Sequence, residues 1–247
     1  YNTVKRKPVK GSYKNLKIYS MSPPSSGGAH IIQILNILEN KDLKSLGPYN
    51  PQSIHYVSSA MEMAFADRAA YLGDMDFVKV PLKGITSKKY AKNLFSKIQS
   101  KKAFRHDEIS KGDAPRFESD HTTHFSIMDK EGNTVVSTQT INGWFGSGLV
   151  AEGTGIVLNN EMDDFSTKPG AMNLFGAVGS KKNLVEPEKR PLSSMSPSIV
   201  FDENGVKLGV GTPSGTRILT CVMQTILNYF EYEKPLYESV AMARYHH

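Results

Sequence analysis

The spacing of apolar residues changes along this 247-residue chain, from helical periodicity in the first half to strand-like alternation in the second. Residues 15–21 alternate between apolar and polar side chains, which predicts a short strand. Apolar side chains then recur every three or four positions in residues 31–38 and 54–72, and again in the lysine-rich stretch 87–100. This spacing predicts helices, each with an apolar stripe on one side.

The alternating pattern begins after a polar, irregular stretch at residues 103–121, which we expect to be an exposed loop open to cleavage. Residues 123–129 and 134–141 flank the turn sequence "KEGN", and this arrangement predicts a β-hairpin. A glycine-rich stretch at residues 143–155 follows, and a short apolar run comes after it. The change of periodicity therefore indicates a junction near residue 121.

A second hairpin is predicted for residues 198–210, with Asn204 and Gly205 as the turn pair, and a last helix for residues 216–230. Helices thus come first, strands follow, and one helix ends the chain. This order differs from the regular strand–helix alternation of a parallel sheet. It predicts an α+β protein whose largely antiparallel sheets are covered by helices.

Composition and charge narrow the possible functions only slightly. The formal net charge is +6, but the lysines are spread and no aromatic-rich basic stripe accompanies them, so a solvated basic face is favoured over nucleic-acid binding. The single cysteine, Cys221, excludes an intramolecular disulfide. No signal-peptide pattern opens the chain, and no apolar run approaches the length needed to span a bilayer. No zinc or haem spacing is present, so we expect neither a metal nor a cofactor.

Two adjacent threonines, Thr122 and Thr123, stand just after the polar loop. Both suit a strand, because β-branched residues favour strands. A threonine hydroxyl attacks a carbonyl only with the help of a base. If the chain were cut before Thr122, its new α-amino group, with a pKa of roughly 7.7–8.0, could supply that base. The residues alone leave both interpretations open.

The stretch 158–166, "LNNEMDDFS", places Glu161, Asp163 and Asp164 within four positions. Several carboxylates that converge on one point could capture a ligand ammonium group. A calcium loop is a second interpretation, although the EF-hand spacing is absent. An exposed acidic turn is the third, and the motif does not choose between them.

Two further motifs could donate hydrogen bonds to an anion. Ser193 and Ser194 follow a proline-fixed turn and could bind a carboxylate, although serines near prolines are common in plain loops. The stretch 209–218, "GVGTPSGTRI", runs from glycines into a helix and so presents unpaired backbone N–H groups. Its glycines do not match the spacing of a dinucleotide-binding turn.

Each motif is ambiguous alone, but their order and wording closely resemble one family. The stretches are "YSMSPPSSGGAHIIQILNILE", "AFADRAAYLGD", "TTHFSIMDKEGN", "GTGIVLNNEMDDFS", "KRPLSSMSPSIV" and "ARYHH". Together they resemble the γ-glutamyltransferase (γ-glutamyltranspeptidase) family of N-terminal-nucleophile hydrolases, over essentially the whole chain. The resemblance implies a four-layer αββα sandwich. It also implies a precursor that cuts itself into a large and a small subunit.

The resemblance further implies where the subunits divide. Cleavage would fall between His121 and Thr122, so that residues 1–121 look like the C-terminal part of the large subunit and residues 122–247 like most of the small one. Thr122 would then be the nucleophile and its own α-amino group the base. The chain looks like a partial family member, so we expect a heterodimer completed by a missing large-subunit segment, which holds an arginine for the substrate carboxylate.

By the same resemblance, the other motifs form one site for a γ-glutamyl group. Thr140 matches the threonine that supports the nucleophile, and Ser214 and Gly215 match the two backbone donors of the oxyanion hole. The implied substrate-binding residues are the ammonium partners Asn142, Glu161 and Asp164 and the carboxylate partners Ser193 and Ser194. The implied reaction transfers the γ-glutamyl group of glutathione or a similar compound to water, an amino acid or a dipeptide.

Two site residues depart from the family pattern. Ser214 stands where a glycine is usual, so a Cβ crowds the oxyanion turn. The loop 167–180 resembles a lid over the pocket, and its aromatic residue is Phe175, where a tyrosine often bonds to the asparagine matched by Asn142. Phe175 can pack but cannot make that hydrogen bond, so we expect a looser gate.

Alternatives within the fold are a poly-γ-glutamate depolymerase or transpeptidase and a β-lactam acylase. An inactive, unprocessed fragment is the alternative from a different class. The resemblance also implies a periplasmic or secreted location.

Overall fold

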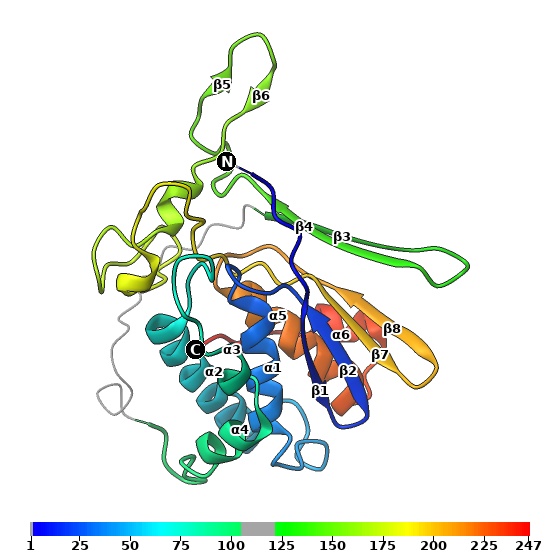
Figure 1. Cartoon of the computed structure of the whole chain (residues 1–247). Helices are drawn as coiled ribbons and strands as arrows, with labels where there is room; N and C mark the ends of the chain where they lie inside the picture. The colour runs from blue at the N-terminus through cyan, green and yellow to red at the C-terminus, as the bar shows by residue number, and fades with distance from the viewer. Residues whose placement is uncertain (1, 105–121) are drawn as a thin grey trace.

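The computed structural model describes residues 2–104 and 122–247 of the chain (Figure 1). Its α-helices are α1 (Gly27–Leu38), α2 (Pro51–Tyr71), α3 (Leu82–Ile85), α4 (Lys88–Phe95), α5 (Arg217–Ile226) and α6 (Leu236–Ala241). Its strands are β1 (Val9–Tyr13), β2 (Leu16–Ser20), β3 (Thr122–Met128), β4 (Thr134–Thr140), β5 (Val150–Ala151), β6 (Ile156–Val157), β7 (Ser198–Asp202) and β8 (Gly205–Val210). The 3-10 helices η1 (Glu161–Asp164) and η2 (Lys181–Asn183) lie between β6 and β7, and the π-helix η3 (Leu227–Glu231) continues α5.

An antiparallel sheet of order β1-β2-β7-β8 joins the start of the chain to its end. Ile18 lies opposite Val200 in the β2–β7 pair, and both side chains are fully buried. The alternation in residues 15–21 correctly predicted β2. It did not predict β1, whose sequence VKGSY contains a glycine and little apolar alternation. That glycine, Gly11, is needed because a Cβ there would collide with Ile32 of α1.

Helix α1 lies at the centre of the core. Every one of its residues is buried, although its spacing predicted only one apolar stripe. The helix packs against β1 and β2 and also against α2, α4 and α5, so it has no face left for solvent. Two of its polar side chains make hydrogen bonds inside the protein: Gln33 Nε2 donates to Asp67 Oδ2 at 2.6 Å, and Asn36 Nδ2 donates to Thr86 O at 2.8 Å.

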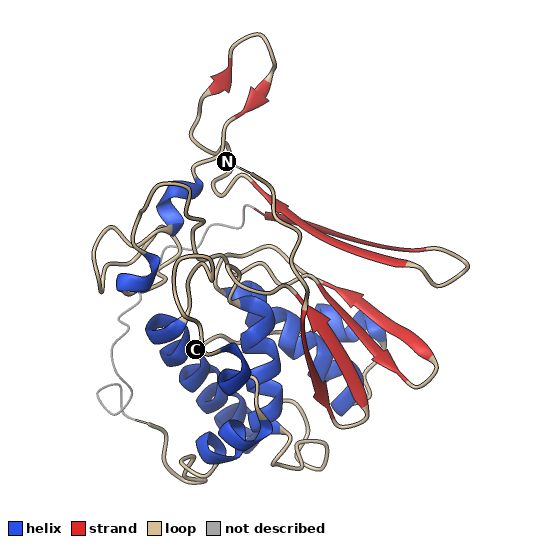
Figure 2. Ribbon diagram, in the orientation of Figure 1, coloured by secondary structure: helices blue, strands red, loops and turns tan. Residues whose placement is uncertain are grey.

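The β3–β4 hairpin lies on the side of the sheet away from the helices (Figure 2). In β8, Leu208 is buried in the helix-facing core, whereas Gly209 and, just after the strand, Gly211 lie at alternate positions and face the hairpin. A Cβ on Gly209 would lie 2.9 Å from Val136, and one on Gly211 would collide with the ring of His124. The two glycines therefore let the second layer of strands approach the first.

The predicted α+β class is confirmed. Of the four layers of the expected αββα sandwich, the described part of the chain supplies a helical layer, the four-stranded sheet and a two-stranded portion of the second sheet. The outer face of this hairpin carries exposed apolar side chains, which are Phe125, Ile127 and Val135. Within residues 2–104 and 122–247, no helix is long and apolar enough to cross a membrane.

The predicted hairpins are present at residues 122–140 and 198–210, but the second turn differs by one residue. Asp202 pairs with Gly205, so the turn residues are Glu203 and Asn204 instead of Asn204 and Gly205. The side chain of Asp202 causes this offset, because its Oδ1 accepts a hydrogen bond from Asn204 N at 2.7 Å. Gly205 then takes a φ of 116°, which suits a glycine.

Candidate functional site

Side chains from widely separated stretches of the chain line a pocket of about 360 Å³. Its lining includes most of the site residues predicted from the sequence, namely Thr122, Thr140, Asn142, Glu161, Asp164, Phe175, Ser193, Ser194 and Gly215. Ser214 directly precedes Gly215 in the same turn. His121, the residue before the predicted cut, lies outside the described residues.

At the base of the hairpin, Thr122 of β3 is hydrogen-bonded to Thr140 of β4. Thr122 lies directly opposite Thr140, and its Oγ1 donates a hydrogen bond to Thr140 Oγ1 at 3.2 Å. Thr140 Oγ1 also accepts from Asn142 N at 2.9 Å, which fixes its position. Because side chains alternate along a strand, Thr123 points the other way and is exposed. Of the two adjacent threonines, Thr122 and Thr123, it is therefore Thr122 that faces the pocket.

The turn after β4 is held to the acidic stretch by two asparagines. Asn142 is buried with a φ of 72°, a conformation that asparagine tolerates better than most residues. Its Nδ2 donates to Asn160 O at 3.2 Å, and Asn160 Oδ1 accepts from Gly143 N at 2.8 Å. These bonds bring the threonine pair and the carboxylates of η1 to the same pocket.

The carboxylates of Glu161 and Asp164 are half-buried in η1, and both line the pocket. Burial, reinforced by the charge of Asp164, raises the pKa of Glu161 to about 7. Burial also raises the pKa of Asp164 to about 7, with the Arg68 charge opposing the rise. Among the described residues, Glu161 Oε1 has no hydrogen-bond partner. Two such groups suit a bound cation, because a positive charge would stabilise their ionised forms.

The calcium interpretation of this stretch gains no support. Within residues 2–104 and 122–247, no three His, Cys, Asp or Glu side chains are grouped in a way that could hold a metal ion. Asp163, the third acid, is used in a loop contact instead, since its Oδ2 accepts from Leu174 N at 2.7 Å.

The loop 167–180 closes over the pocket from the side of η1. Asn173 Nδ2 donates to Asp164 Oδ1 at 2.9 Å, and Asn173 Oδ1 accepts from the backbone N–H of Phe175 at 3.0 Å. The Phe175 ring packs on the turn at Ser214–Gly215, because a Cβ on Gly215 would lie 2.6 Å from its Cδ1. Phe175 also lines the pocket. Asn173, which the sequence analysis did not single out, fastens this loop to the acid pair.

The turn that contains Ser214 and Gly215 connects β8 to α5. Ser214 has a φ of 112° and Gly215 a φ of 52°, so both residues lie in a region that favours glycine. Ser214 O accepts from Arg217 N at 2.9 Å, which starts α5 directly after the turn. A serine thus occupies a backbone conformation in which its Cβ is strained.

The serine pair is held by the segment that precedes α1. Ser193 O accepts from both the backbone N and the Oγ of Ser26, at 2.8 and 3.0 Å, and Ser193 N donates to Pro24 O at 3.1 Å. A Cβ on Gly27 would lie 2.7 Å from Ser194 O, so this approach requires a glycine. The motif "SPPSSGG" therefore ends a strand, begins a helix and positions the serine pair.

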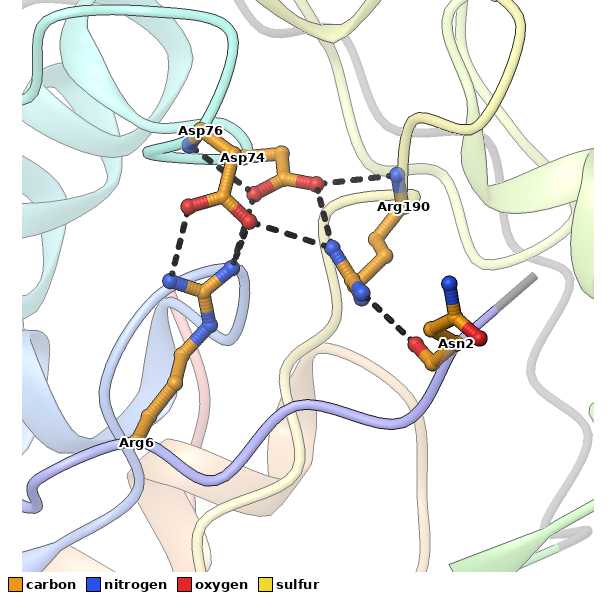
Figure 3. A network of polar contacts seen from close by, with 5 residues as sticks. All are labelled: Asn2, Arg6, Asp74, Asp76 and Arg190. Atoms are coloured by element: carbon orange, nitrogen blue, oxygen red, sulfur yellow. Dashed lines mark hydrogen bonds and ion pairs between the residues drawn. The ribbon is translucent and has the colours of Figure 1, made fainter.

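A second anchor holds the chain just before the serines (Figure 3). Asp74 is fully buried in the loop after α2, and its Oδ2 accepts from Arg190 N at 3.1 Å and Arg190 Nη1 at 3.4 Å. Its Oδ1 accepts from Arg6 Nη2 at 3.2 Å, and Asp76 bridges both arginines. Asp74 thus ties the N-terminal segment and the segment leading to Ser193 to one point.

Arg68, from α2, is the other pocket residue that the sequence analysis missed. Its Nη2 donates to Ser194 Oγ at 3.2 Å, and its side chain is buried. A charged pair, Asp67–Arg68, interrupts an otherwise apolar helical stripe, but this signal does not show which partner Arg68 contacts.

Comparison with known proteins gives the same family throughout the chain. The family model described as gamma-glutamyltranspeptidase matches residues 1–247. A glutathione hydrolase proenzyme of Escherichia coli (strain K12) is 48% identical over 247 residues, which is 100% of this chain and 43% of that protein. The chain therefore spans less than half the length of this curated relative.

Solved structures agree on the fold. The gamma-glutamyltranspeptidase from Pseudomonas nitroreducens complexed with L-DON superposes with a TM-score of 0.50 and 55% identity, over 51% of this chain and 65% of that one. A cephalosporin acylase from Bacillus halodurans, only 20% identical, has a TM-score of 0.71 over 92% of this chain and 38% of that one. The predicted N-terminal-nucleophile hydrolase fold is confirmed, and the chain belongs to the gamma-glutamyltranspeptidase family.

Proposed function

We propose that this chain carries the catalytic centre of a γ-glutamyl transferase and hydrolase, with Thr122 as the nucleophile. The observation that carries the proposal is the Thr122–Thr140 hydroxyl pair in one pocket with a half-buried acid pair and a serine pair. A γ-glutamyl group has an acyl carbon at one end and an ammonium and a carboxylate at the other. It therefore needs all three kinds of partner.

The nucleophile is made by cleavage between His121 and Thr122. Residues 1–121 then belong to the large subunit and residues 122–247 to the small one. Cleavage gives Thr122 a free α-amino group, which can act as a base near neutral pH. This proposal is supported by the pairing of the Thr122 hydroxyl with Thr140 in the pocket.

The reaction proceeds in two acyl-transfer steps. Thr122 Oγ1 attacks the γ-carbonyl carbon of glutathione or a similar compound, and the α-amino group takes the hydroxyl proton. The backbone N–H groups of Ser214 and Gly215 stabilise the oxyanion. The C–N bond then breaks as the leaving amine takes that proton, and a γ-glutamyl ester remains on Thr122. Water, an amino acid or a dipeptide attacks the ester and restores the hydroxyl.

The other end of the substrate determines specificity. Asn142, Glu161 and Asp164 hold the α-ammonium group. Ser193 and Ser194 donate to the α-carboxylate. A partner segment of the large subunit completes the heterodimer and adds an arginine to the carboxylate site. These two roles are supported by the chemistry of the side chains, because the carboxylates of Glu161 and Asp164 accept hydrogen bonds and the hydroxyls of Ser193 and Ser194 can donate them.

The test combines processing and turnover in the purified full-length protein. We expect a new N-terminus at Thr122 by N-terminal sequencing and intact mass, together with hydrolysis of γ-glutamyl-p-nitroanilide. Thr122→Ala should abolish both. Thr123→Ala is the matched control, because its side chain points away from the pocket, and it should retain both. Continued cleavage at this bond in Thr122→Ala would show that an outside protease makes the cut, and an unprocessed wild type would support the inactive-fragment alternative.

An acylase or a poly-γ-glutamate depolymerase is the alternative within the fold. Glutaryl-p-nitroanilide lacks the α-amino group, so an acylase that does not bind an ammonium would hydrolyse it as well as the γ-glutamyl compound. The half-buried carboxylates of Glu161 and Asp164 favour the γ-glutamyl substrate. Faster cleavage of poly-γ-glutamate than of the anilide would instead favour the depolymerase. The location, which we expect to be periplasmic or secreted, can be checked by cell fractionation.

A further inference from the structure

Arg68 is a buried arginine in the last turn of α2, with only 4% of its surface exposed. Arginine is rarely buried without a partner, because removing its charge from water is costly. The neighbouring acid, Asp67, does not serve as that partner. Its carboxylate is taken by Gln33 Nε2 at 2.6 Å and Tyr90 OH at 3.1 Å.

The guanidinium is instead directed at the serine side of the pocket. Nε donates to Ser26 Oγ at 3.1 Å and Nη2 donates to Ser194 Oγ at 3.2 Å. Ser26 Oγ in turn donates to Ser193 O at 3.0 Å. Arg68 thus contacts one serine of the pair directly and the other through a single intermediate.

The direction of these bonds determines what Ser194 can do. A guanidinium has donors and no acceptor, so Ser194 must accept from Arg68. Its own hydroxyl hydrogen is then free to donate to another group. Because Ser194 and Arg68 both line the pocket, a carboxylate bound there can receive that hydrogen bond.

The positive charge of Arg68 is also placed where it can attract a substrate carboxylate. Glu161 and Asp164 line the same pocket, so a substrate carboxylate would enter a site that already holds two acids. Arg68 interacts electrostatically with Asp164. Its positive charge lies next to Ser194, so this part of the pocket suits an anion. The part lined by Glu161 and Asp164 suits a cation.

We propose that Arg68 is a positioning residue that orients the Ser194 hydroxyl toward the substrate α-carboxylate and offsets the repulsion between that carboxylate and the acid pair. The inference rests on the proposed γ-glutamyl chemistry and adds to it a specificity determinant from the large-subunit part of this chain. It predicts that Arg68 matters only for substrates that carry the α-carboxylate.

The test compares two substrates in the processed full-length protein. γ-Glutamyl-p-nitroanilide has the α-carboxylate, and 4-aminobutyryl-p-nitroanilide is the same compound without it. We expect Arg68→Gln to lower kcat/KM for the first by about 10- to 100-fold, mainly through KM, as for a lost charge-assisted hydrogen bond. The same variant should change kcat/KM for the second by less than about 3-fold. Arg68→Lys keeps the charge without the planar fork and should recover part of the loss.

A double-mutant cycle separates positioning from folding. In a Ser194→Ala background, Arg68→Gln should have little additional effect, because the hydroxyl through which it acts is gone. Equal losses on both substrates, or additive effects in the cycle, would overturn the proposal. If Arg68→Gln does not fold, as judged by circular dichroism, Ser26→Ala removes one of the two Arg68 contacts and should show the same selective loss, to a smaller extent. A wild type that cleaves neither substrate would refute the proposed function itself, which is a distinct result.

Discussion

The Asp164→Asn substitution should stabilise the protein at alkaline pH while weakening its capture of a γ-glutamyl substrate. Asp164 has an ordinary pKa of 3.8, and burial raises the pKa of its carboxyl to about 7. The ionised form is therefore disfavoured in the folded protein relative to the unfolded chain. Asparagine has nearly the shape of the protonated acid, and its Oδ1 can still accept the hydrogen bond from Asn173.

The size of the effect follows from linkage. The folded pKa exceeds the unfolded one by about 3, and each pKa unit corresponds to about 1.36 kcal/mol, so full ionisation costs about 4 kcal/mol. Between about pH 4 and pH 7 the folded state binds more protons than the unfolded state, and stability falls as pH rises. Above pH 7 the whole cost is present. The difference in unfolding free energy between the variant and the wild type should therefore grow by about 2–3 kcal/mol from pH 5 to pH 8.5.

Urea unfolding followed by far-ultraviolet circular dichroism at pH 5, 7 and 8.5 measures this difference. Glu152→Gln, which neutralises an exposed carboxylate, is the matched control and should show no such growth. The variant should also raise KM for γ-glutamyl-p-nitroanilide by about 10- to 100-fold, because a charge partner of the ammonium is lost. A stability difference that stays constant with pH would refute the argument that Asp164 is kept ionised at a cost to the fold.

Three further substitutions test the framework around the pocket. Gly211→Ala places a Cβ against the His124 ring and should destabilise the protein by about 1–3 kcal/mol, measured by thermal denaturation. It should also lower turnover in the γ-glutamyl-p-nitroanilide assay. Gly84→Ala is the control, because its Cβ would meet open space, and it should change neither quantity. Asp74→Ala removes a buried carboxylate that accepts from Arg6 and Arg190, but Asp76 still contacts both arginines, so it should cost about 1–3 kcal/mol in urea unfolding, more than the roughly 0–1 kcal/mol of a solvent-exposed pair. Ser214→Gly relieves a φ of 112° and should add about 1–2 kcal/mol of stability by the same measurement, so an unchanged or lower stability would contradict the strain.

The parts of the fold that the sequence predicted are those governed by local spacing. The β3–β4 hairpin follows from strict alternation around a turn, and its register then places Thr122 opposite Thr140. β1 could not be predicted in this way, since its Gly11 is selected by contact with a helix that comes later in the chain. The complete burial of α1 has the same origin, because it depends on how many neighbours surround the helix.

The same distinction between local and long-range contacts decides which residues of the site could be predicted from the sequence. Motifs whose members are adjacent, such as Ser193–Ser194, could be recognised from the residues and the family resemblance. Arg68 and Asn173 could not, because each acts on a partner far along the chain or in an irregular loop. Arg68 is separated from Ser194 by 126 positions, and no local periodicity records that contact.

The hairpin that begins with Thr122 behaves mechanically as a beam fixed at one end. Each seven-residue strand extends roughly 23 Å at about 3.3 Å per residue. Gly211, just after β8, faces His124 near the root, and Gly209 of β8 faces Ser126 and Val136 past the midpoint, so the tip at Asp129–Asn133 projects beyond these contacts. In such a beam, displacement is greatest at the free end and smallest at the support. The two threonine hydroxyls sit at the support, so bending of the tip leaves their separation almost unchanged.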